Sequence, residues 1–444
     1  MKTTIAAIST PPGNSGIGII RVSGPEVPKL IKKLFKKPLN PREATLRKLH
    51  DLDGNIIDNA IAIYFQQPKS YTGEDMLEIH THGNPIILET ILNNITRNNI
   101  RHAKPGEFTE KAFLNDKIDL TQAEAVSDLI TSRSLSAVKG AYNSLRGRFS
   151  DKILEASDKV LELRAKIESA INFPEDDVPE NSRITLKRDL SIIEKKIRQV
   201  ILSASKGIKL NKQNTFCVAG QPNTGKSSLI NLLLGDSSSI VSDIPGTTRD
   251  SIQYEVQSDG HTFMIIDTAG LRDSDNEIEK QGIIKTKESL SKADKVLYVV
   301  DDQIGFSDKD KNIINEFGIE NYDLIFNKID ITKKKSSLKK GNVNKAYISV
   351  LKEKGIEHVI NLIKQDNSQK ISAENTITAR ARHLSSARTA LQSLYNAQEY
   401  LDNDELELIA EELRLAHEQL SQITSGNSSE ELLAKIFSEF CIGK

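Results

Sequence analysis

At 444 residues and a formal net charge of −1, the chain should hold two or three domains, and its charge gives no global reason to bind nucleic acid or a membrane. Any RNA partner must therefore be held by local patches of charge. The two cysteines lie far apart in the sequence, make no disulfide framework and suit a reducing cytosol. The N-terminus lacks a secretory signal and no apolar run approaches the roughly eighteen residues of a membrane span, so we expect a soluble cytoplasmic protein with no membrane span.

Residues 1–118 change pattern every few positions and are expected to form an α+β domain. Strands are predicted over Thr4–Ser9, Gly16–Val22, Ile56–Phe65 and Met76–His80, and a helix over Ile86–Ile95. The spacing of Gly13, Gly16 and Gly18 resembles a nucleotide loop only loosely, and no well-formed helix follows it. We interpret these glycines as a turn between strands.

One predicted strand carries two histidines and a carboxylate on the same face. Glu78, His80 and His82 alternate with period two, so their side chains share a face if the strand is regular. Such a set can bind zinc, but no further ligand cluster accompanies it. Surface or hydrogen-bonded histidines are therefore the favoured interpretation.

Two helical segments, residues 119–210 and 373–444, flank the central part of the chain. In both segments apolar residues recur at helical spacing, as at Ile153 and Val160, which indicates the core of a helical bundle. Because the same kind of segment lies on both sides, the simplest architecture is one α-helical domain into which residues 211–372 are inserted.

The inserted part alternates strands with helices, as a parallel α/β sheet requires, and carries a phosphate-loop motif. Strands are predicted over Phe216–Ala219, Phe263–Ile266, Val296–Val300 and Leu324–Phe326. After the first of them, Gly220–Ser227 matches the pattern G-x-x-x-x-G-K-[ST], and the helical run Ser228–Leu234 follows. Backbone N–H groups there can bind phosphate oxygens, Lys226 can reach the β- and γ-phosphates, and the Ser227 hydroxyl can ligate Mg²⁺.

Further motifs of a nucleotide site follow along the chain. Gly246–Asp250 is a candidate switch segment whose threonine hydroxyl can complete the Mg²⁺ shell. Asp267–Gly270 follows a predicted strand and can reach the Mg²⁺ shell and the γ-phosphate. Asp330 follows the predicted strand Leu324–Phe326, and its carboxylate can accept hydrogen bonds from the N1–H and the 2-amino group of guanine. Adenine has neither of these donors. Ser349 falls where the last base-contacting loop would lie. Together these motifs predict a P-loop GTPase domain.

Leu271 is a departure from Ras-like GTPases. It directly follows Asp267–Gly270, where those proteins carry the glutamine that orients the attacking water. A leucine can neither donate to water nor accept from it. Hydrolysis must therefore use another residue, another charge or a partner, and Arg249 in the switch segment is a candidate.

The chain resembles the MnmE (also called TrmE) family of tRNA-modifying GTPases over essentially its whole length. The motifs that carry the resemblance are Gly220–Ser228, Asp243–Asp250, Asp267–Arg272, the terminal Phe440–Lys444, and, toward the N-terminus, Pro11–Gly13, Tyr71–Asp75, Pro105–Phe108 and Leu114–Asp119. The GTPase motifs alone would also fit ribosome-assembly GTPases, but the Cys-Ile-Gly-Lys terminus and the N-terminal motifs do not. Pro245 and Val350 are the local departures from the family pattern, and neither affects a key side chain.

The resemblance implies a role for many positions. The nucleotide would be held by Asn223, Thr224, Gly225, Lys226, Ser227, Ser228, Ser242, Asp243, Ile244, Pro245, Gly246, Thr247, Thr248, Asp267, Thr268, Ala269, Gly270, Asn327, Lys328, Asp330 and Ser349. Ser227 and Thr248 match the Mg²⁺ ligands, and Asn223, Ser242, Ile244 and Thr247 match positions that hold K⁺ against the phosphates. Glu279 matches the residue that aligns the attacking water, although a solvated helix residue is the alternative.

Residues 1–118 are similar to tetrahydrofolate-binding domains that also mediate dimerisation. The matching folate-contacting positions are Arg21, Glu78, Lys117 and Lys444. Cys441 formally fits a prenylation motif, but Gly443 and Lys444 do not suit one, and a nucleophilic role for its thiol stays open.

The two remaining features have ordinary interpretations. Cys217, in the strand under the phosphate loop, is expected to be a small core residue. Lys333–Lys335 and Lys339–Lys340 lie in a polar loop, and a solvated loop is favoured over an RNA-binding patch.

The resemblance therefore implies a K⁺-activated GTPase that, with a flavin-dependent partner, adds an aminomethyl or carboxymethylaminomethyl group to C5 of the wobble uridine of certain tRNAs. Its cofactors would be GTP, Mg²⁺, K⁺ and 5,10-methylenetetrahydrofolate, with 5-formyltetrahydrofolate as an analogue. Its partners would be a second copy in a homodimer, an MnmG/GidA-type flavoprotein in a heterotetramer, and tRNA. The alternative is a GTP-switched binding protein for ribosome assembly, without one-carbon chemistry, which the absence of folate binding would favour.

Overall fold

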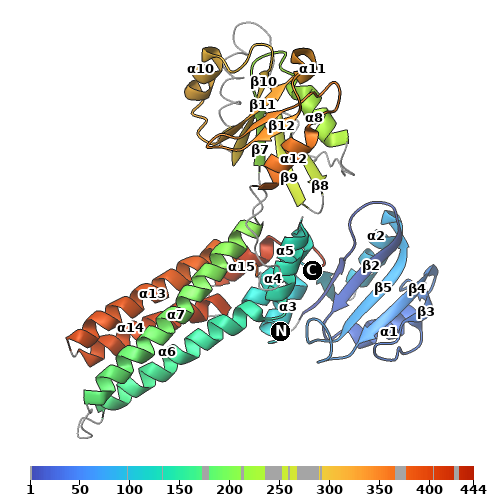
Figure 1. Cartoon of the computed structure of the whole chain (residues 1–444). Helices are drawn as coiled ribbons and strands as arrows, with labels where there is room; N and C mark the ends of the chain where they lie inside the picture. The colour runs from blue at the N-terminus through green and yellow to red at the C-terminus, as the bar shows by residue number, and fades with distance from the viewer. Residues whose placement is uncertain are drawn as a thin grey trace. The chain divides into compact units, whose positions relative to one another are not determined.

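The computed structural model describes residues 3–97, 99–132, 134–172, 180–211, 215–235, 253–258, 261–267, 290, 293–365, 377–403, 405–424 and 430–444. The chain divides into two compact units. The first comprises Met1–Thr131, Ala141–Ile208 and Ile377–Lys444, and the second comprises Ser132–Gly140 and Lys209–Thr376. Figure 1 labels the helices and strands of both units.

The N-terminal part of the first unit is a six-stranded sheet in the order β3-β4-β5-β2-β1-β6. Its strands are β1 (Thr4–Ile8), β2 (Ser15–Ser23), β3 (Thr45–His50), β4 (Ile56–Phe65), β5 (Met76–Gly83) and β6 (Ile100–His102). Only the β1–β6 pair within this described sheet is parallel. The four predicted strands and the predicted helix are confirmed, and β3 and β6 are additional.

Two helices cover one face of this sheet, and a third follows it. They are α1 (Val27–Phe35), α2 (Pro85–Thr96) and α3 (Glu107–Leu114). Apolar residues of α1 and α2 form one core with alternate residues of the strands, such as Ile20 and Ile79. Helix α2 begins where it does because the side chain of Asn84 accepts a hydrogen bond from the Ile86 N–H, and Pro85 suits the first helical position.

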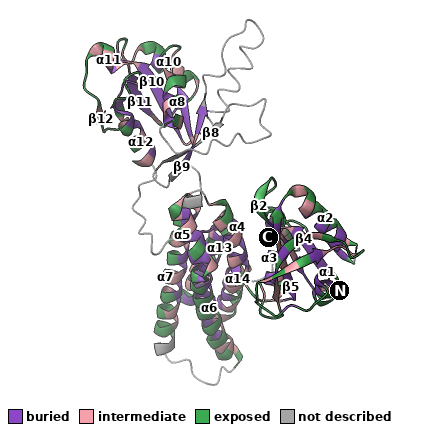
Figure 2. Cartoon of the chain, turned by 90° about the vertical axis from the view of Figure 1, so that its right-hand side faces the viewer, coloured by how far each residue is buried: buried purple, intermediate pink, exposed green. Residues whose placement is uncertain are grey.

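The rest of the first unit is helical, and segments from both sides of the insertion share one core. Its helices are α4 (Leu120–Thr131), α5 (Leu135–Leu145, which the division between units crosses), α6 (Arg148–Asn172), α7 (Glu180–Asn211), α13 (Ala381–Asp402), α14 (Leu406–Thr424) and α15 (Glu430–Ser438). Helices α6, α7, α13 and α14 lie side by side (Figure 1) and bury residues such as Val160, Ile197, Leu394 and Leu420 against one another. Figure 2 shows buried and exposed residues alternating along these helices, as the predicted bundle requires.

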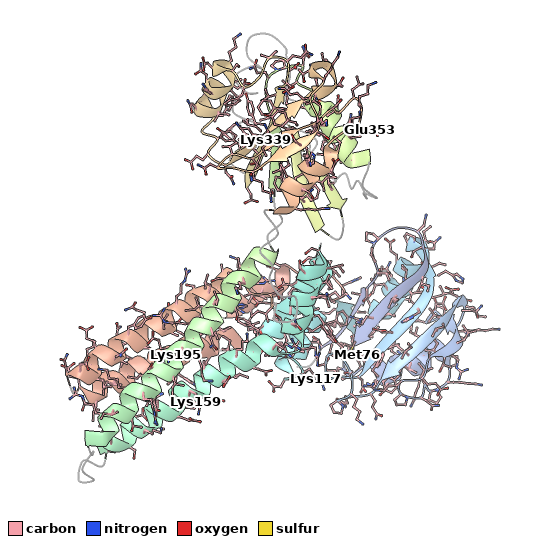
Figure 3. All side chains as sticks on the ribbon, in the orientation of Figure 1. Met76, Lys117, Lys159, Lys195, Lys339 and Glu353 are labelled. Carbon is pink, nitrogen blue, oxygen red and sulfur yellow. The ribbon has the colours of Figure 1, made fainter. Side chains whose placement is uncertain are left out.

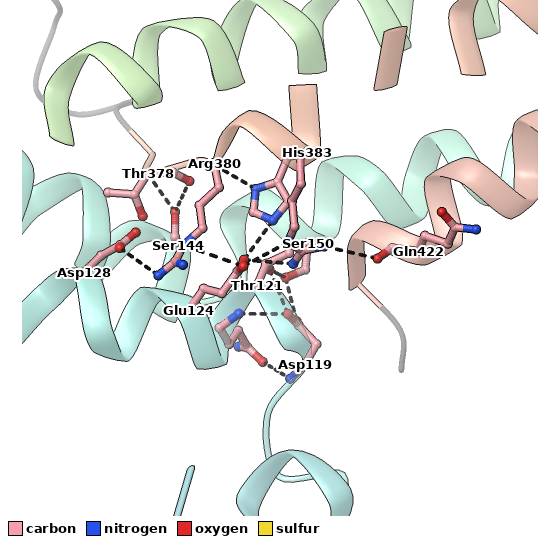
Figure 4. Close-up of polar contacts among 12 residues, drawn as sticks. Asp119, Thr121, Glu124, Asp128, Ser144, Ser150, Thr378, Arg380, His383 and Gln422 are labelled. Atoms are coloured by element: carbon pink, nitrogen blue, oxygen red, sulfur yellow. Dashed lines mark hydrogen bonds and ion pairs between the residues drawn. The ribbon is translucent and has the colours of Figure 1, made fainter. Parts of the chain in front are cut away.

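A buried ionic cluster ties α4 to the start of α13, where the chain re-enters the bundle (Figure 4). Both carboxylate oxygens of Glu124 accept from Arg382, at 2.9 Å each, and His383 Nε2 lies 2.8 Å from Glu124 Oε2. The backbone N–H of Arg380 donates to His383 Nδ1, which leaves the imidazole proton on Nε2, facing Glu124. Burial alone would raise the pKa of Glu124, but His383 and Arg382 hold it at about 2.

The second unit is built on a seven-stranded sheet in the order β12-β13-β11-β10-β7-β9-β8. Its strands are β7 (Thr215–Ala219), β8 (Gln253–Ser258), β9 (His261–Asp267), β10 (Lys295–Asp301), β11 (Tyr322–Asn327), β12 (Ser337–Lys339) and β13 (Lys345–Tyr347). Strands β13, β11, β10, β7 and β9 are parallel, and β8 and β12 are antiparallel to their neighbours. The described helices are α8 (Lys226–Gly235), α10 (Asp308–Glu316), α11 (Ile329–Thr332) and α12 (Ile356–Gln365).

The predicted fold class is confirmed: an α+β N-terminal domain, a helical bundle and an α/β P-loop domain inserted into the bundle. The four strands predicted for the α/β part are all present, and β8, β12 and β13 are additional. Within the described part of the chain, no helix is both long and apolar enough to cross a membrane. Because the parallel strands share a direction, the loops after β7, β10, β11 and β13 meet at one edge of the sheet.

Candidate functional site

The loop between β7 and α8 curves tightly because two glycines occupy backbone conformations that other residues rarely adopt. Gly220 has φ 141° and Gly225 has φ 94°. A Cβ atom on Gly220 would lie 2.2 Å from the Val299 carbonyl oxygen, and one on Gly225 would lie 2.3 Å from Asn327 Nδ2. The loop therefore packs directly against the neighbouring strand ends.

Lys226 is the first residue of α8 and is buried. Its ammonium group donates to the carbonyl oxygens of Gly220, at 2.9 Å, and of Gln221, at 2.8 Å. The positive charge therefore lies inside the curve of the loop, beside the helix N-terminus. Ser227 and Asn223 are exposed there, and Asn223 adopts a left-handed conformation with φ 63°. This arrangement can bind the phosphates of a nucleotide.

Asp310, on α10, holds the phosphate loop in place through a hydrogen bond with Gln221. Its carboxylate accepts from Gln221 Nε2 at 2.7 Å, from the Tyr298 hydroxyl at 3.0 Å and from Ser307. Burial alone would raise the pKa of Asp310, but the hydrogen bonds from Ser307, Gln221 and Tyr298 hold it below its usual value. The sequence alone does not identify this residue as part of the site. Ser307 and Asp310 have the spacing of a helix capping box, which gives no sign of the contact with Gln221.

The loops after β11 and β13 meet the phosphate loop through Asn327. Its Nδ2 donates to the Thr224 carbonyl oxygen at 2.9 Å, while its Oδ1 accepts from the backbone N–H groups of Lys328 and Val350. Asp330 Oδ1 accepts from the Ser349 hydroxyl at 2.5 Å. The structure thus brings the predicted base-recognition residues beside the predicted phosphate-binding residues.

Many predicted site residues lie outside the described residues. These are Ser242, Asp243, Ile244, Pro245, Gly246, Thr247, Thr248, Arg249, Thr268, Ala269, Gly270 and Glu279. Leu271, which replaces the glutamine of Ras-like GTPases, also lies outside them. Asp267 is the last residue of β9, which is the parallel neighbour of β7. Ser228 is exposed in the first turn of α8, and Lys328 Nζ lies 2.6 Å from Asp301.

A second cluster forms where the C-terminal residues pack on the N-terminal sheet. Arg21 donates to Glu78 Oε1 from Nε, at 3.0 Å, and from Nη2, at 2.8 Å, and to the Gly443 carbonyl oxygen at 3.2 Å. Its guanidinium lies 5.9 Å from the Tyr71 ring centroid and 5.8 Å from that of Phe108. This cluster contains two of the four predicted folate-contacting residues.

Of the other two predicted folate-contacting residues, Lys444 adjoins the Arg21 cluster and Lys117 makes its hydrogen bond elsewhere. The Lys444 main-chain oxygen accepts from the Phe108 N–H at 3.2 Å, so the last residue adjoins the Arg21 cluster. Lys117 is exposed, and its Nζ donates to the Pro68 carbonyl oxygen at 3.0 Å. Within the described part of the chain, no hydrogen bond connects Lys117 with Arg21, Glu78 or Lys444.

The alternative of a zinc site on β5 is not supported. Glu78 pairs with Arg21, and His82 Nδ1 lies 2.9 Å from Asp58 Oδ1. No group of three or more histidine, cysteine or acidic residues among those described is arranged to hold a metal ion. The favoured interpretation of hydrogen-bonded histidines fits these contacts.

The two cysteines have different surroundings. Cys217 is buried in β7, as predicted, and Cys441 is exposed in the C-terminal segment after α15. Exposure makes the Cys441 thiol accessible to a reactant, and its role in the chemistry stays a prediction.

Comparison with known proteins gives matches over the whole chain. A family model described as "MnmE helical domain" matches residues 120–441, and one described as "GTP-binding protein TrmE N-terminus" matches residues 4–117. The chain is 44% identical to the tRNA modification GTPase MnmE of Francisella tularensis subsp. novicida, covering 100% of this chain and 99% of that protein. It is 40% identical to the MnmE of Coxiella burnetii (strain Dugway 5J108-111), covering 99% and 98%.

A solved structure is also similar to part of the chain. The G domain of the Thermotoga maritima iron transporter FeoB is 24% identical, covering 35% of this chain and 100% of that chain, with a TM-score of 0.27. A TM-score that low supports no conclusion about the function of this chain.

Proposed function

The chain belongs to the MnmE family, and we propose on this basis that it hydrolyses GTP in the course of tRNA modification. The observation that carries the proposal is the meeting of two groups of residues at one edge of the second unit's sheet. Lys226 and the phosphate loop lie beside Asn327, Asp330 and Ser349. Family membership favours tRNA modification over a role in ribosome assembly.

Guanine selection is proposed to rest on Asp330. One carboxylate oxygen accepts from the Ser349 hydroxyl, which orients the group. A carboxylate is an acceptor on both oxygens, so it can take the N1–H and the 2-amino group of guanine. Adenine has an acceptor at N1 and no 2-amino group, so it is rejected.

We propose that two cations assist hydrolysis. Mg²⁺ would be held by Ser227 and Thr248, and K⁺ by Asn223 with Ser242, Ile244 and Thr247. The described members fit: Ser227 presents a hydroxyl in the first turn of α8, and the exposed Asn223 can offer an amide oxygen from the phosphate loop. When bound, such cations stabilise the negative charge that develops on the transferring phosphoryl group. Glu279 would orient the attacking water, and Arg249 is a further candidate in the switch segment.

The Arg21 cluster is proposed to bind a tetrahydrofolate. Glu78 supplies the carboxylate that the amino group and ring N–H of a pterin require, and the aromatic rings of Tyr71 and Phe108 hold Arg21 in place. Lys117 and Lys444 would pair with the negative glutamate tail of the folate. The one-carbon unit of 5,10-methylenetetrahydrofolate would then serve the modification of the wobble uridine at C5, together with a flavin-dependent MnmG/GidA-type partner. The exposed thiol of Cys441 is a candidate nucleophile for this chemistry.

Steady-state GTP hydrolysis by the purified chain in matched KCl and NaCl tests the enzymatic proposal. We expect faster hydrolysis in K⁺, because Na⁺ is smaller and fits a cage of neutral oxygens less well. Asn223→Ala should lose the K⁺ response while GTP binding largely survives, because the backbone loop and Lys226 remain. Equal rates in the two salts, or an Asn223→Ala protein that K⁺ still stimulates, would rule out the K⁺ site. No GTP hydrolysis in either salt would rule out the proposed function itself.

A further inference from the structure

The second unit has an unusual concentration of lysines at one edge of its sheet. Between residues 333 and 354 the sequence has eight lysines and a single acidic residue, Glu353, although the whole chain has a net charge of −1. All eight lysines are exposed. We call this segment, which contains the edge strand β12 and its neighbour β13, the lysine edge; Figure 3 labels Lys339 and Glu353 on it.

Few carboxylates balance the lysine edge. Among the described residues, the only ion pair made by these eight lysines joins Lys334 to Asp302, at 2.8 Å. Lys339 and Lys345 face each other directly in the register of β12 and β13. Like charges directly opposite one another destabilise a strand pair. The arrangement therefore costs stability in the free protein.

Protection of an edge strand against aggregation explains only part of this pattern. Charged side chains that give such protection, lysine above all, lie on the edge strand itself. Protection does not account for Lys333 and Lys335, which precede β12, or for Lys340, which follows it. A bound polyanion would account for all of them, because it would remove the repulsion that the free protein bears.

We propose that the lysine edge binds the phosphate backbone of RNA, which revises the solvated loop favoured from the sequence alone. The inference rests on the proposed function only for the choice of tRNA as that RNA. A protein partner fits less well, because lysine is depleted from protein interfaces. Base stacking is not available at Tyr347: Phe326 stacks on its ring with centroids 4.9 Å apart, and the Lys334 and Lys339 ammonium groups lie 5.6 and 5.2 Å from its centroid. Recognition is therefore of phosphate charge and not of sequence.

The test uses the full chain and a fluorescently labelled tRNA transcript. In the variant Lys333→Gln/Lys335→Gln/Lys340→Gln, three phosphate contacts are lost. We expect the slope of log affinity against log salt concentration to fall in magnitude by about two to three, and the affinity near 0.1 M salt to fall at least about tenfold. GTP hydrolysis should stay at the wild-type rate, because none of the three lysines belongs to the nucleotide site.

A matched control removes the same charge elsewhere. Lys166, Lys187 and Lys195 are exposed on α6 and α7 (Lys195 is labelled in Figure 3), and their replacement by Gln should leave the slope unchanged. An unchanged slope and affinity in the lysine-edge variant would overturn the inference while leaving the proposed function intact. So would an equal loss in the control, which would show a general charge effect.

Discussion

At the scale of single residues, the nucleotide site depends on side chains that each connect the phosphate loop to another part of the second unit. Asn327 links the phosphate loop at Thr224 with the loop after β13 at Val350. Asp310 links the phosphate loop at Gln221 with the core at Tyr298. Both amide and carboxylate groups are buried, so loss of either would leave polar partners unsatisfied. Phosphate binding and base recognition are therefore structurally connected.

Asp330 gives the sharpest prediction at this scale. In Asp330→Asn the amide oxygen can still accept from Ser349, but the amide NH₂ meets the 2-amino group of guanine, donor against donor. Loss of one charge-assisted contact costs about 1.5–3 kcal/mol, so GTP affinity should fall roughly ten- to a hundredfold. Xanthosine triphosphate has an oxygen in place of that amino group. Its affinity for the variant should therefore be higher than its affinity for the wild-type protein. Equilibrium titrations with both nucleotides decide it; wild-type GTP affinity in the variant would contradict the assignment.

The sequence predicts the residues that would contact the nucleotide better than it predicts the residues that hold them in place. The phosphate-loop spacing and the position of Asp330 after a strand carry their own chemistry, so local pattern was enough to propose them. Asp310 lies 89 positions from Gln221, and nothing local predicts that contact. Short strands were missed for a similar reason: β3 and β12 are partly exposed, so their sequences lack a continuous apolar run.

At the scale of helices, the ionic cluster around Glu124 fixes the point where α13 resumes the bundle. Glu124 is 2% exposed and joins α4 to Arg382 and His383 of α13. Removing one member of a buried ion pair leaves its partners uncompensated, which costs about 3–5 kcal/mol. We therefore expect Glu124→Gln to lower the free energy of unfolding by about that amount at pH 7. The surface variant Glu162→Gln should change it by less than about 1 kcal/mol.

The same cluster predicts a pH dependence. The pKa of Glu124 is about 2 in the folded protein, against 4.5 ordinarily. Between these values the unfolded chain binds the proton more readily, so stability is full above pH 4.5 and is lost as the pH falls toward 2. The stability difference between wild type and Glu124→Gln should therefore narrow below pH 4.5. Denaturant unfolding followed by circular dichroism from pH 7 to pH 3.5 measures it; a constant difference would show that Glu124 is not held ionised by its partners.

At the scale of the whole molecule, distant parts of the chain combine within the first unit. Helices from before and after the insertion share one core. The two ends of the chain also meet, because the Gly443 carbonyl oxygen accepts from both Arg21 and the Ser9 hydroxyl, 434 positions away. The proposed folate site is thus completed by the C-terminal residues. The helical spacing of apolar residues predicts the interrupted bundle without any reference to a family. The contact between the chain ends is indicated only by the family resemblance, through the folate-contacting position that Lys444 matches.

The central claim is that GTP hydrolysis by this chain serves the modification of tRNA. Mass-spectrometric nucleoside analysis of tRNA tests it in cells that lack the protein and in cells that carry either the wild type or Lys226→Ala. Lys226 places its charge inside the phosphate loop, so the variant should be unable to hydrolyse GTP. The account predicts that C5-modified wobble uridine disappears without the protein, returns with the wild type and stays absent with Lys226→Ala. Normal levels of the modified uridine in cells without the protein would contradict it.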